Sequence, residues 1–490
     1  MMRARSIYVM VLLVATLVAC YINLPTVLYN LTQIGDLSSN DKSSSQRDVD
    51  LHGVTDFLLS NRNLFVMSLN SSEFAERFIH ALTPLIIAEP GEPLARPQHP
   101  EFSTNCSASR YKRFLSGNVL HRPRVIVDFV PFGFDLDKLE IRLLENYNNV
   151  AAFVIFENEL TQTAVPKPLI FDTVKNTPRF YRFKDKIIHI IGTADDILQC
   201  VGGSWAGWTP EDWSLEMAMR KCMVSLFMSL PVNHPHFKLQ QHIVAALGND
   251  VYRNGRIIIP RLKPLKKYSR NHDRLVQSAP LAIQGDGDEI ISGHVLHHLK
   301  HCELNSHDFP LYAPCVSYKH NVNFVFAEDE LHLNISPDEP DELLHHLIAA
   351  GPEIDLLYKF IVFNDTFRHE HIRPHFHTGL VSAVHLSSIH EPTEIWLKAI
   401  ATHHGMENSD IYLHFPRGIV DHILKGNISA PWLHSVFGLN NLCNINTSAQ
   451  RVDYFSNNTR ANLRDSLPIV LIENARRYPF IIPPCGITKP

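Results

Sequence analysis

The chain has 490 residues, of which 45% are hydrophobic and 19% are charged, an ordinary composition for a globular protein with a sizeable core. Its formal net charge of -5 is spread along the sequence, without a basic stripe or an acidic tail. Nucleic acid is therefore not expected as a partner.

An uncharged, largely apolar run extends from Ile7 to Leu24 and follows Arg3 and Arg5. Its length suits a helix that spans a bilayer, and the positive-inside rule places residues 1–6 in the cytosol and the rest of the chain across the membrane. We therefore expect a transmembrane signal anchor at 7–24 and a single-pass type II topology. A cleaved signal peptide is the alternative, and it too sends the bulk of the chain into the secretory pathway.

Sequons of the form Asn-x-Ser/Thr agree with a lumenal location, because such asparagines are glycan acceptors only there. The expected acceptors are Asn70, Asn105, Asn364, Asn427, Asn446 and Asn457.

Cys20 falls inside the apolar run, and the number of the other cysteines is odd. Up to three disulfides are therefore expected, with connectivity left open, and the lack of a CxxC pair argues against structural zinc.

Residues 25–50 are predicted to form a stem, since Ser, Asp, Asn and Gln dominate from about residue 32. Residues 51–123 form an N-terminal extension, in which the amphipathic stretch 54–87 is predicted to be helical. A proline-rich stretch from Pro90 to Pro100 separates that helix from the rest of the extension.

From residue 124 to residue 490 we expect one lumenal domain. Its first part alternates short apolar runs, predicted as strands at 125–132, 150–157 and 186–192, with helix-like stretches, the first from Asp135 to Tyr147. This alternation indicates an α/β domain with a mainly parallel sheet. Another helix is predicted to begin near Thr209, with Pro210 at its first position.

The most informative local feature is the apolar run LAIQ, which leads through Gly285 into Asp286, Gly287, Asp288 and Glu289. Two aspartates one residue apart at a strand end can direct carboxylate oxygens at one Mg²⁺ or Mn²⁺. Such a cation neutralises the charge that develops on a departing nucleoside diphosphate. Asp286 and Asp288 are therefore predicted metal ligands.

A separate carboxylate or His would then act as general base on the acceptor hydroxyl, and Glu289 or another acid could serve. Glu289 and Asp288 are the predicted catalytic residues. An Asp-x-Asp triplet is common by chance, however. The second copy, Asp135-Leu136-Asp137, is predicted to cap the helix that begins beside it.

The segment from Phe134 to Phe171 resembles the opening of glycosyltransferase family 17, in which the pattern DLLE.R..EL...VD.FV..E...T..G.PKPL.F recurs. The matching positions are Asp135, Leu139, Glu140, Arg142, Glu145, Val150, Phe153, Val154, Glu157, Thr161, Lys167, Pro168, Leu169 and Phe171. The segments RFKDKIIHI, Trp213 to Arg220, GDGDEI and SLPIVLIENARRYPFII are similar to later family segments. The resemblance covers roughly Val125 to Ile482.

The resemblance implies a GT-A type, Rossmann-like domain behind the anchor, in the Golgi membrane. It implies inverting transfer of N-acetylglucosamine from UDP-GlcNAc, with Mn²⁺ or Mg²⁺, to a mannose-containing N-glycan on a glycoprotein acceptor. The expected residues at the donor or substrate are Glu140, Arg142, Glu157, Trp213 and Arg220. A structural ion pair, or core packing for Trp213, is the alternative for each.

Two further hypotheses stay open. Ile291 stands where the family has proline, and Gly285 stands where it has a polar or acidic residue, so the chain could be a noncatalytic glycan-binding or scaffold relative of the same fold. The run from Arg368 to His377 contains four histidines and could ligate a transition metal. A solvated loop is the preferred interpretation, because the run lacks a helical HExxH arrangement.

Overall fold

The computed structural model describes part of the chain, and all of that part lies in the unit 49–490. The described residues are 68, 71–88, 104–108, 111–112, 114–200, 214–249, 251–254, 256–257, 279–304, 311–313, 315–319, 325–326, 348–349, 351–363, 383–388, 397–398, 400–402, 433–434, 468–474, 477–478 and 481.

Several predicted features lie outside these residues. They are the anchor at 7–24, the stem at 25–50, Trp213, the histidine-rich run at 368–377, and the sequons at Asn70, Asn364, Asn427, Asn446 and Asn457. Within the described part of the chain, no helix is both long and apolar enough to cross a membrane.

A six-stranded sheet forms the centre of the domain, in the spatial order β10-β14-β7-β2-β3-β4. Four neighbouring strands run parallel: β7 (Leu281–Gln284), β2 (Ile126–Phe132), β3 (Ala152–Asn158) and β4 (Ile187–Gly192). β14 (Glu353–Leu356) is antiparallel to β7, and β10 (Leu311–Tyr312) is antiparallel to β14. The expected α/β class with a mainly parallel sheet is confirmed.

The three strands predicted from apolar runs are β2, β3 and β4, and β3 is buried along its whole length. Helices on both faces of a parallel sheet remove both faces of each strand from water, which is why the runs are continuously apolar. The predicted helix after β2 is α5 (Leu136–Asn146). Its cap is Asp135, whose carboxylate accepts from the Lys138 amide at 3.4 Å, as predicted for the second Asp-x-Asp triplet.

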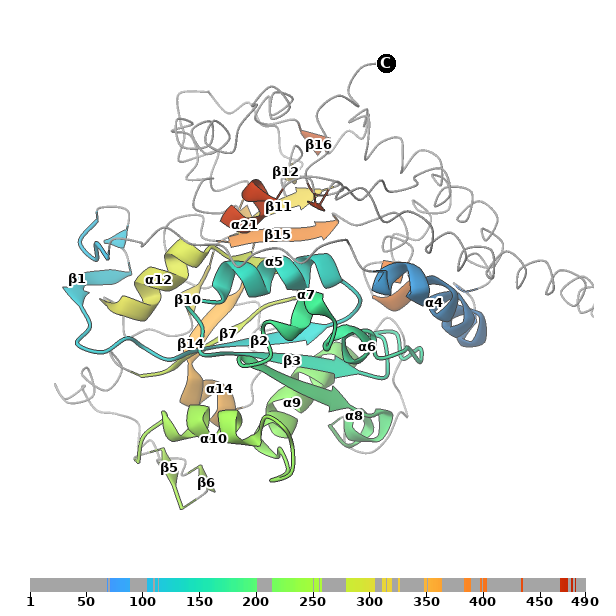
Figure 1. Ribbon diagram of the computed structural model, residues 1–490, viewed down its shortest axis with the longest axis horizontal. Helices are drawn as coiled ribbons and strands as arrows, with labels where there is room; N and C mark the ends of the chain where they lie inside the picture. Colours follow the sequence, from blue (N-terminus) through green and yellow to red (C-terminus); the bar gives the residue numbers. More distant parts are fainter. Residues whose placement is uncertain are drawn as a thin grey trace, which may run out of the picture. The chain divides into compact units, whose positions relative to one another are not determined.

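One face of the sheet is covered by α8 (Ala194–Cys200), α9 (Ser214–Met228), α10 (Phe237–Ala245) and α14 (Leu357–Phe363) (Figure 1). Their apolar side chains form one core with the strands; Phe129 of β2, for example, packs against Phe227 and Phe360. The other face carries α5, α6 (Ile170–Val174), α7 (Pro178–Tyr181) and α12 (Gly293–His301), and α21 (Ile469–Glu473) contacts α5 (Figure 1).

A second sheet has the order β16-β12-β11-β15-β8, with β13 beside β11. Its strands are β8 (Glu289–Ile291), β11 (Cys315–Lys319), β12 (Val325–Phe326), β13 (Ile348–Ala349), β15 (Ala383–Ser388) and β16 (Leu433–His434). Ile291 is buried and pairs with Ala383 of β15. An isoleucine at this position retains the N–H and the β-branched side chain that suit a strand, whereas a proline would have no N–H to donate.

The N-terminal extension is attached to the domain by covalent and backbone contacts. The disulfide Cys106–Cys302 and the pairing of β1 (Leu115–Val119) with β9 (Cys302–Leu304) join the two. A second disulfide, Cys200–Cys222, links α8 to α9. Two short strands, β5 (Tyr252–Arg253) and β6 (Arg256–Ile257), pair with each other in antiparallel orientation. In the extension, α4 (Ser72–Ile87) confirms the C-terminal part of the helix predicted at 54–87.

The direction of chain progression reverses beside β2. From β2 the chain adds β3 and then β4 on one side, and it later returns to place β7 on the other side of β2. In open α/β sheets, ligands bind outside the carboxyl ends of the strands at such a switch point. This edge of the sheet is therefore where a site is expected.

Candidate functional site

The Asp286-Gly287-Asp288 turn lies at the switch point. It follows β7 after one residue, Gly285, and connects β7 to β8. A Cβ added to Gly287 would lie 3.5 Å from the carbonyl oxygen of Pro131 in β2, so the turn passes close to the end of the neighbouring strand. The predicted motif is thus at the carboxyl edge of the parallel strands.

Glu289 fixes the shape of this turn. Its side chain is fully buried, its Oε2 accepts a hydrogen bond from the Asp286 amide at 2.9 Å, and its own amide donates to the Asp286 carbonyl at 3.0 Å. A Cβ added to Gly285 would lie 2.9 Å from Glu289 Oε2 and 3.0 Å from Pro352 Cβ. Glycine at position 285 therefore leaves the space in which the Glu289 carboxylate packs.

Arg142, predicted near the donor, extends from α5 to the turn. Its guanidinium donates to both carboxylate oxygens of Asp128, at 2.6 and 2.9 Å, and to the main-chain oxygen of Asp286 at 2.5 Å. Arg142 and Asp128 are both buried. Burial by itself lowers the pKa of Arg142, but Asp128, Glu289 and Asp286 outweigh it and raise that pKa, so the guanidinium is charged.

Arg220, also predicted near the donor, reaches the same aspartate from α9. It pairs with the Asp286 carboxylate and donates to Glu216 Oε1 through Nε at 3.1 Å and Nη2 at 2.7 Å. The Asp286 side chain is 34% exposed, whereas that of Arg220 is 2% exposed. Two residues predicted from separate segments therefore converge on Asp286, one on its main chain and the other on its carboxylate.

Asp288 is contacted by residues from the C-terminal half of the chain. Lys398 Nζ donates to its Oδ2 at 3.2 Å, and His385 Nε2 lies 3.7 Å from its Oδ1. The segment containing Lys398 also contacts the loop after β3: Thr163 Oγ1 donates to the Ile400 carbonyl at 2.7 Å. This segment therefore connects the Asp288 side of the switch point with the loop after β3.

The donor set around the turn is compatible with a hard divalent cation. Among the described residues, no three His, Cys, Asp or Glu side chains are placed to hold a metal. Magnesium is commonly bound through only one or two carboxylates together with substrate phosphates, and Asp286 and Asp288 supply two. Their carboxylate oxygens suit Mg²⁺ or Mn²⁺ rather than a soft metal.

Glu157, a third residue predicted near the donor, lies at the end of β3 and is fully buried. Its carboxylate accepts hydrogen bonds from the amides of Phe171 at 2.7 Å and Asp172 at 3.0 Å, at the N-terminus of α6. His189 Nε2 lies 3.2 Å from its Oε2. In this position the carboxylate satisfies amides that a helix start leaves without backbone partners.

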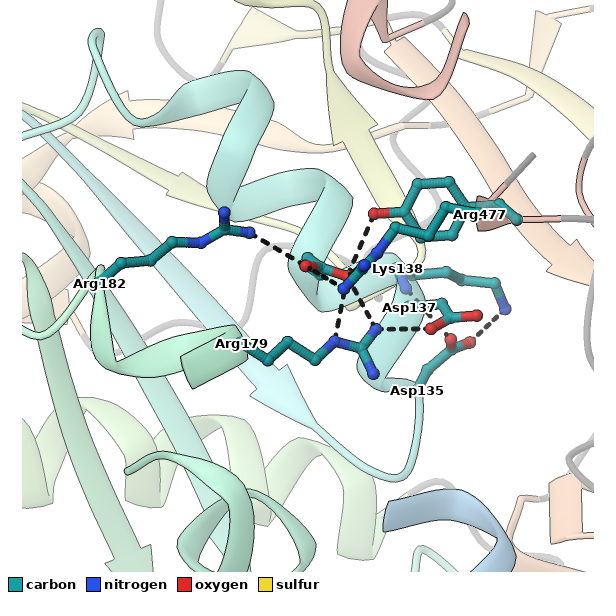
Figure 2. Close-up of polar contacts among 8 residues, drawn as sticks. Asp135, Asp137, Lys138, Arg179, Arg182 and Arg477 are labelled. Atoms are coloured by element: carbon teal, nitrogen blue, oxygen red, sulfur yellow. Dashed lines mark hydrogen bonds and ion pairs between the residues drawn. The ribbon is translucent and has the colours of Figure 1, made fainter. Parts of the chain in front are cut away.

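Glu140, the fourth such residue, belongs to α5 and forms ion pairs with three arginines. Its buried carboxylate accepts from Arg179 at 3.0 Å, Arg182 at 3.0 Å and Arg477 at 2.9 Å, and Tyr478 also donates to it. Asp137 and the pair Asp135–Lys138 flank this cluster (Figure 2). The cluster attaches the chain around residue 477 to α5 and α7.

Sequence reasoning missed several groups at the turn, among them Asp128 and Lys398. Asp128 carries a visible signal, because a carboxylate inside the apolar strand VIVDFVPF requires a buried partner. Lys398 carries none, since only the fold brings it to Asp288. Among the predicted glycan acceptors, Asn105 is described, and it is exposed, as an acceptor must be.

A comparison with protein-family models finds one match: residues 55–235 match the model described as Glycosyltransferase family 17. These residues include β2, α5, β3, β4 and α9, and thus Arg142 and Arg220, whereas the Asp286–Asp288 turn lies beyond them. No curated protein and no solved structure matches the chain. The match confirms the resemblance inferred from the Phe134–Phe171 pattern, over residues 55–235.

Proposed function

We propose that the chain is a metal-dependent, inverting glycosyltransferase that moves N-acetylglucosamine from UDP-GlcNAc to a mannose-containing N-glycan of a glycoprotein. The family match supports glycosyl transfer in general. The observation that carries the proposal is the Asp286-Gly287-Asp288 turn at the switch point of the sheet, held by Arg142 and Arg220. A GT-A type fold is part of the proposal.

In this proposal, each residue at the turn has a separate role. Arg142 and Glu289 hold the main chain of Asp286, and Arg220 orients its carboxylate. Asp286 and Asp288 would hold Mg²⁺ or Mn²⁺, which supplies positive charge to the departing diphosphate. Of the two predicted catalytic carboxylates, Asp288 has a side chain that is 12% exposed, whereas Glu289 is fully buried. Asp288 is therefore the one of the two that a bound donor can reach, and its role in this proposal is that of a metal ligand.

The proposal extends to the compartment. A signal anchor at 7–24 would hold the chain in the Golgi membrane as a type II protein, with residues 124–490 in the lumen. Exposed Asn105 and the disulfides Cys106–Cys302 and Cys200–Cys222 are compatible with an oxidising lumen, because structural disulfides persist mainly in such compartments.

The test measures the release of UDP by the full chain, purified in detergent, from a panel of UDP-sugars with an N-glycan acceptor. Manganese, magnesium and a chelator are compared, and Asp288→Asn is compared with Asp185→Asn, an exposed aspartate before β4. We expect release from UDP-GlcNAc that requires metal, that is lost in Asp288→Asn and that persists in Asp185→Asn. Folded protein that turns over none of the donors would exclude the proposal.

The second candidate is a noncatalytic relative of the same fold. It is favoured by the ion pairs that already engage both aspartates, Asp286 with Arg220 and Asp288 with Lys398. It predicts that the full chain binds N-glycans on a glycan array and releases no UDP from any donor. It also predicts that Asp288→Asn leaves glycan binding unchanged.

A further inference from the structure

Lys167 lies at the same edge of the sheet as the aspartate turn. It belongs to the loop between β3 and α6, and its amide donates to the Glu159 carbonyl at 2.9 Å. Its ammonium lies 5.5 Å from the centre of the Phe134 ring, two residues beyond the end of β2. β3 and β7 flank β2 on opposite sides, and the usual spacing of neighbouring strands separates them by about 10 Å. Lys167 follows β3 and the turn follows β7, so the two approach the end of β2 from opposite sides.

The Lys167 ammonium has no hydrogen-bond partner among the described residues. The residue is 7% exposed, and its Nζ is buried. The Glu157 carboxylate attracts the ammonium, but it accepts its hydrogen bonds from the amides of Phe171 and Asp172, and His189 Nε2 lies 3.2 Å from it. A buried charge is normally paired, because removal of an ion from water is costly. An exception at a candidate site requires a functional explanation.

We propose that Lys167 is a donor-binding residue whose ammonium contacts a phosphate oxygen of a nucleoside diphosphate held at the Asp286–Asp288 turn. This inference rests on the proposed function and adds to it a residue on the far side of β2. A phosphate oxygen would supply the missing acceptor, and Lys is a common phosphate ligand as a compact point charge.

The ammonium is buried in this structure, and one described segment contacts its loop. Residues 400–402 contact the loop of Lys167 through Thr163 Oγ1 to the Ile400 carbonyl and the Gln162 amide to the Ala401 carbonyl. The same segment pairs with the turn through Lys398 and Asp288. A ligand that takes over Asp288 therefore competes with Lys398 of this segment.

The experiment measures the affinity of the full chain for UDP and for uridine by isothermal titration calorimetry, in Mn²⁺. Lys167→Met is compared with Lys167→Arg and with Lys186→Met. Lys186 is a matched control, because its ammonium donates to the Tyr147 and Val150 carbonyls at the amino end of β4, at the opposite edge of the sheet.

We expect Lys167→Met to weaken UDP binding about 10-fold to 100-fold, as for loss of a charged hydrogen bond, and to leave uridine binding unchanged. Lys167→Arg should retain most of the affinity. Lys186→Met should bind UDP normally but unfold at a lower urea concentration, because two main-chain oxygens lose their donor.

Each contrary result has a separate meaning. Normal UDP binding by folded Lys167→Met overturns the assignment of Lys167 and leaves the proposed function intact. Unfolding of Lys167→Met also overturns it, since the ammonium would then have a structural role through Glu157 or the Phe134 ring. Absence of UDP binding by the unsubstituted chain overturns both the inference and the transferase proposal.

Discussion

Replacement of Arg142 by Met is expected to destabilise the domain strongly. The substitution removes two hydrogen bonds to Asp128 and one to the Asp286 main chain, and it leaves the Asp128 carboxylate buried at about 1% exposure without that partner. Removal of one member of a buried ion pair costs about 3–5 kcal/mol, because the remaining charge is neither solvated nor paired. We therefore expect Arg142→Met to lower the free energy of unfolding by about that amount.

A double-variant cycle separates the ion pair from packing. In Arg142→Met with Asp128→Leu, no buried charge of this pair remains, and replacement of such a pair by apolar side chains is often neutral or stabilising. The double variant should therefore be more stable than Arg142→Met alone by at least about 1 kcal/mol.

The assay is urea unfolding of the full chain with its disulfides intact, followed by tryptophan fluorescence and circular dichroism. The same preparations are titrated with UDP, because Arg142 holds the main chain of Asp286. A loss below about 1 kcal/mol in Arg142→Met would refute the reasoning from burial. Equal losses in the single and double variants would show that packing, and not charge, determines the effect.

Three further outcomes are expected. Burial lowers the pKa of Lys167 from 10.5 to about 8. Between pH 8 and pH 10.5 the unfolded chain therefore binds more protons than the folded chain, so the free energy of unfolding rises with pH by at most about 3 kcal/mol. Urea unfolding of Lys167→Met at several pH values should lack this rise. The Cys106–Cys302 bridge spans 196 residues and the Cys200–Cys222 bridge spans 22. Replacement of Cys106 and Cys302 by Ala should therefore lower the free energy of unfolding in urea by about 2 kcal/mol more than replacement of Cys200 and Cys222, because the longer loop constrains the unfolded chain more. Equal losses would contradict this chain-entropy reasoning. Lys398→Met should raise the affinity for Mn²⁺, measured by electron paramagnetic resonance, several-fold because its ammonium competes for Asp288; unchanged affinity would rule out this competition.

The local elements and the fold class could be predicted from short segments of the sequence. Strands β2, β3 and β4 and helix α5 are where apolar periodicity predicts them, because each buries a pattern that is complete within a short segment. The capping role of Asp135 was likewise local, since its carboxylate reaches an amide three residues along the chain. The Asp286-Gly287-Asp288 motif could be placed at the end of a strand, because it follows the apolar run LAIQ after one glycine.

Which side chains meet at the turn could not be predicted in this way, because it depends on how distant elements pack. Arg142 and Arg220 converge on Asp286 from α5 and α9, whereas Glu140 and Glu157, singled out by the same pattern, bind arginines and helix amides elsewhere. Lys398 reaches Asp288 across 110 residues. Local periodicity specifies which face of an element is buried, but contacts between distant elements depend on the order of strands in the sheet, which no short segment encodes.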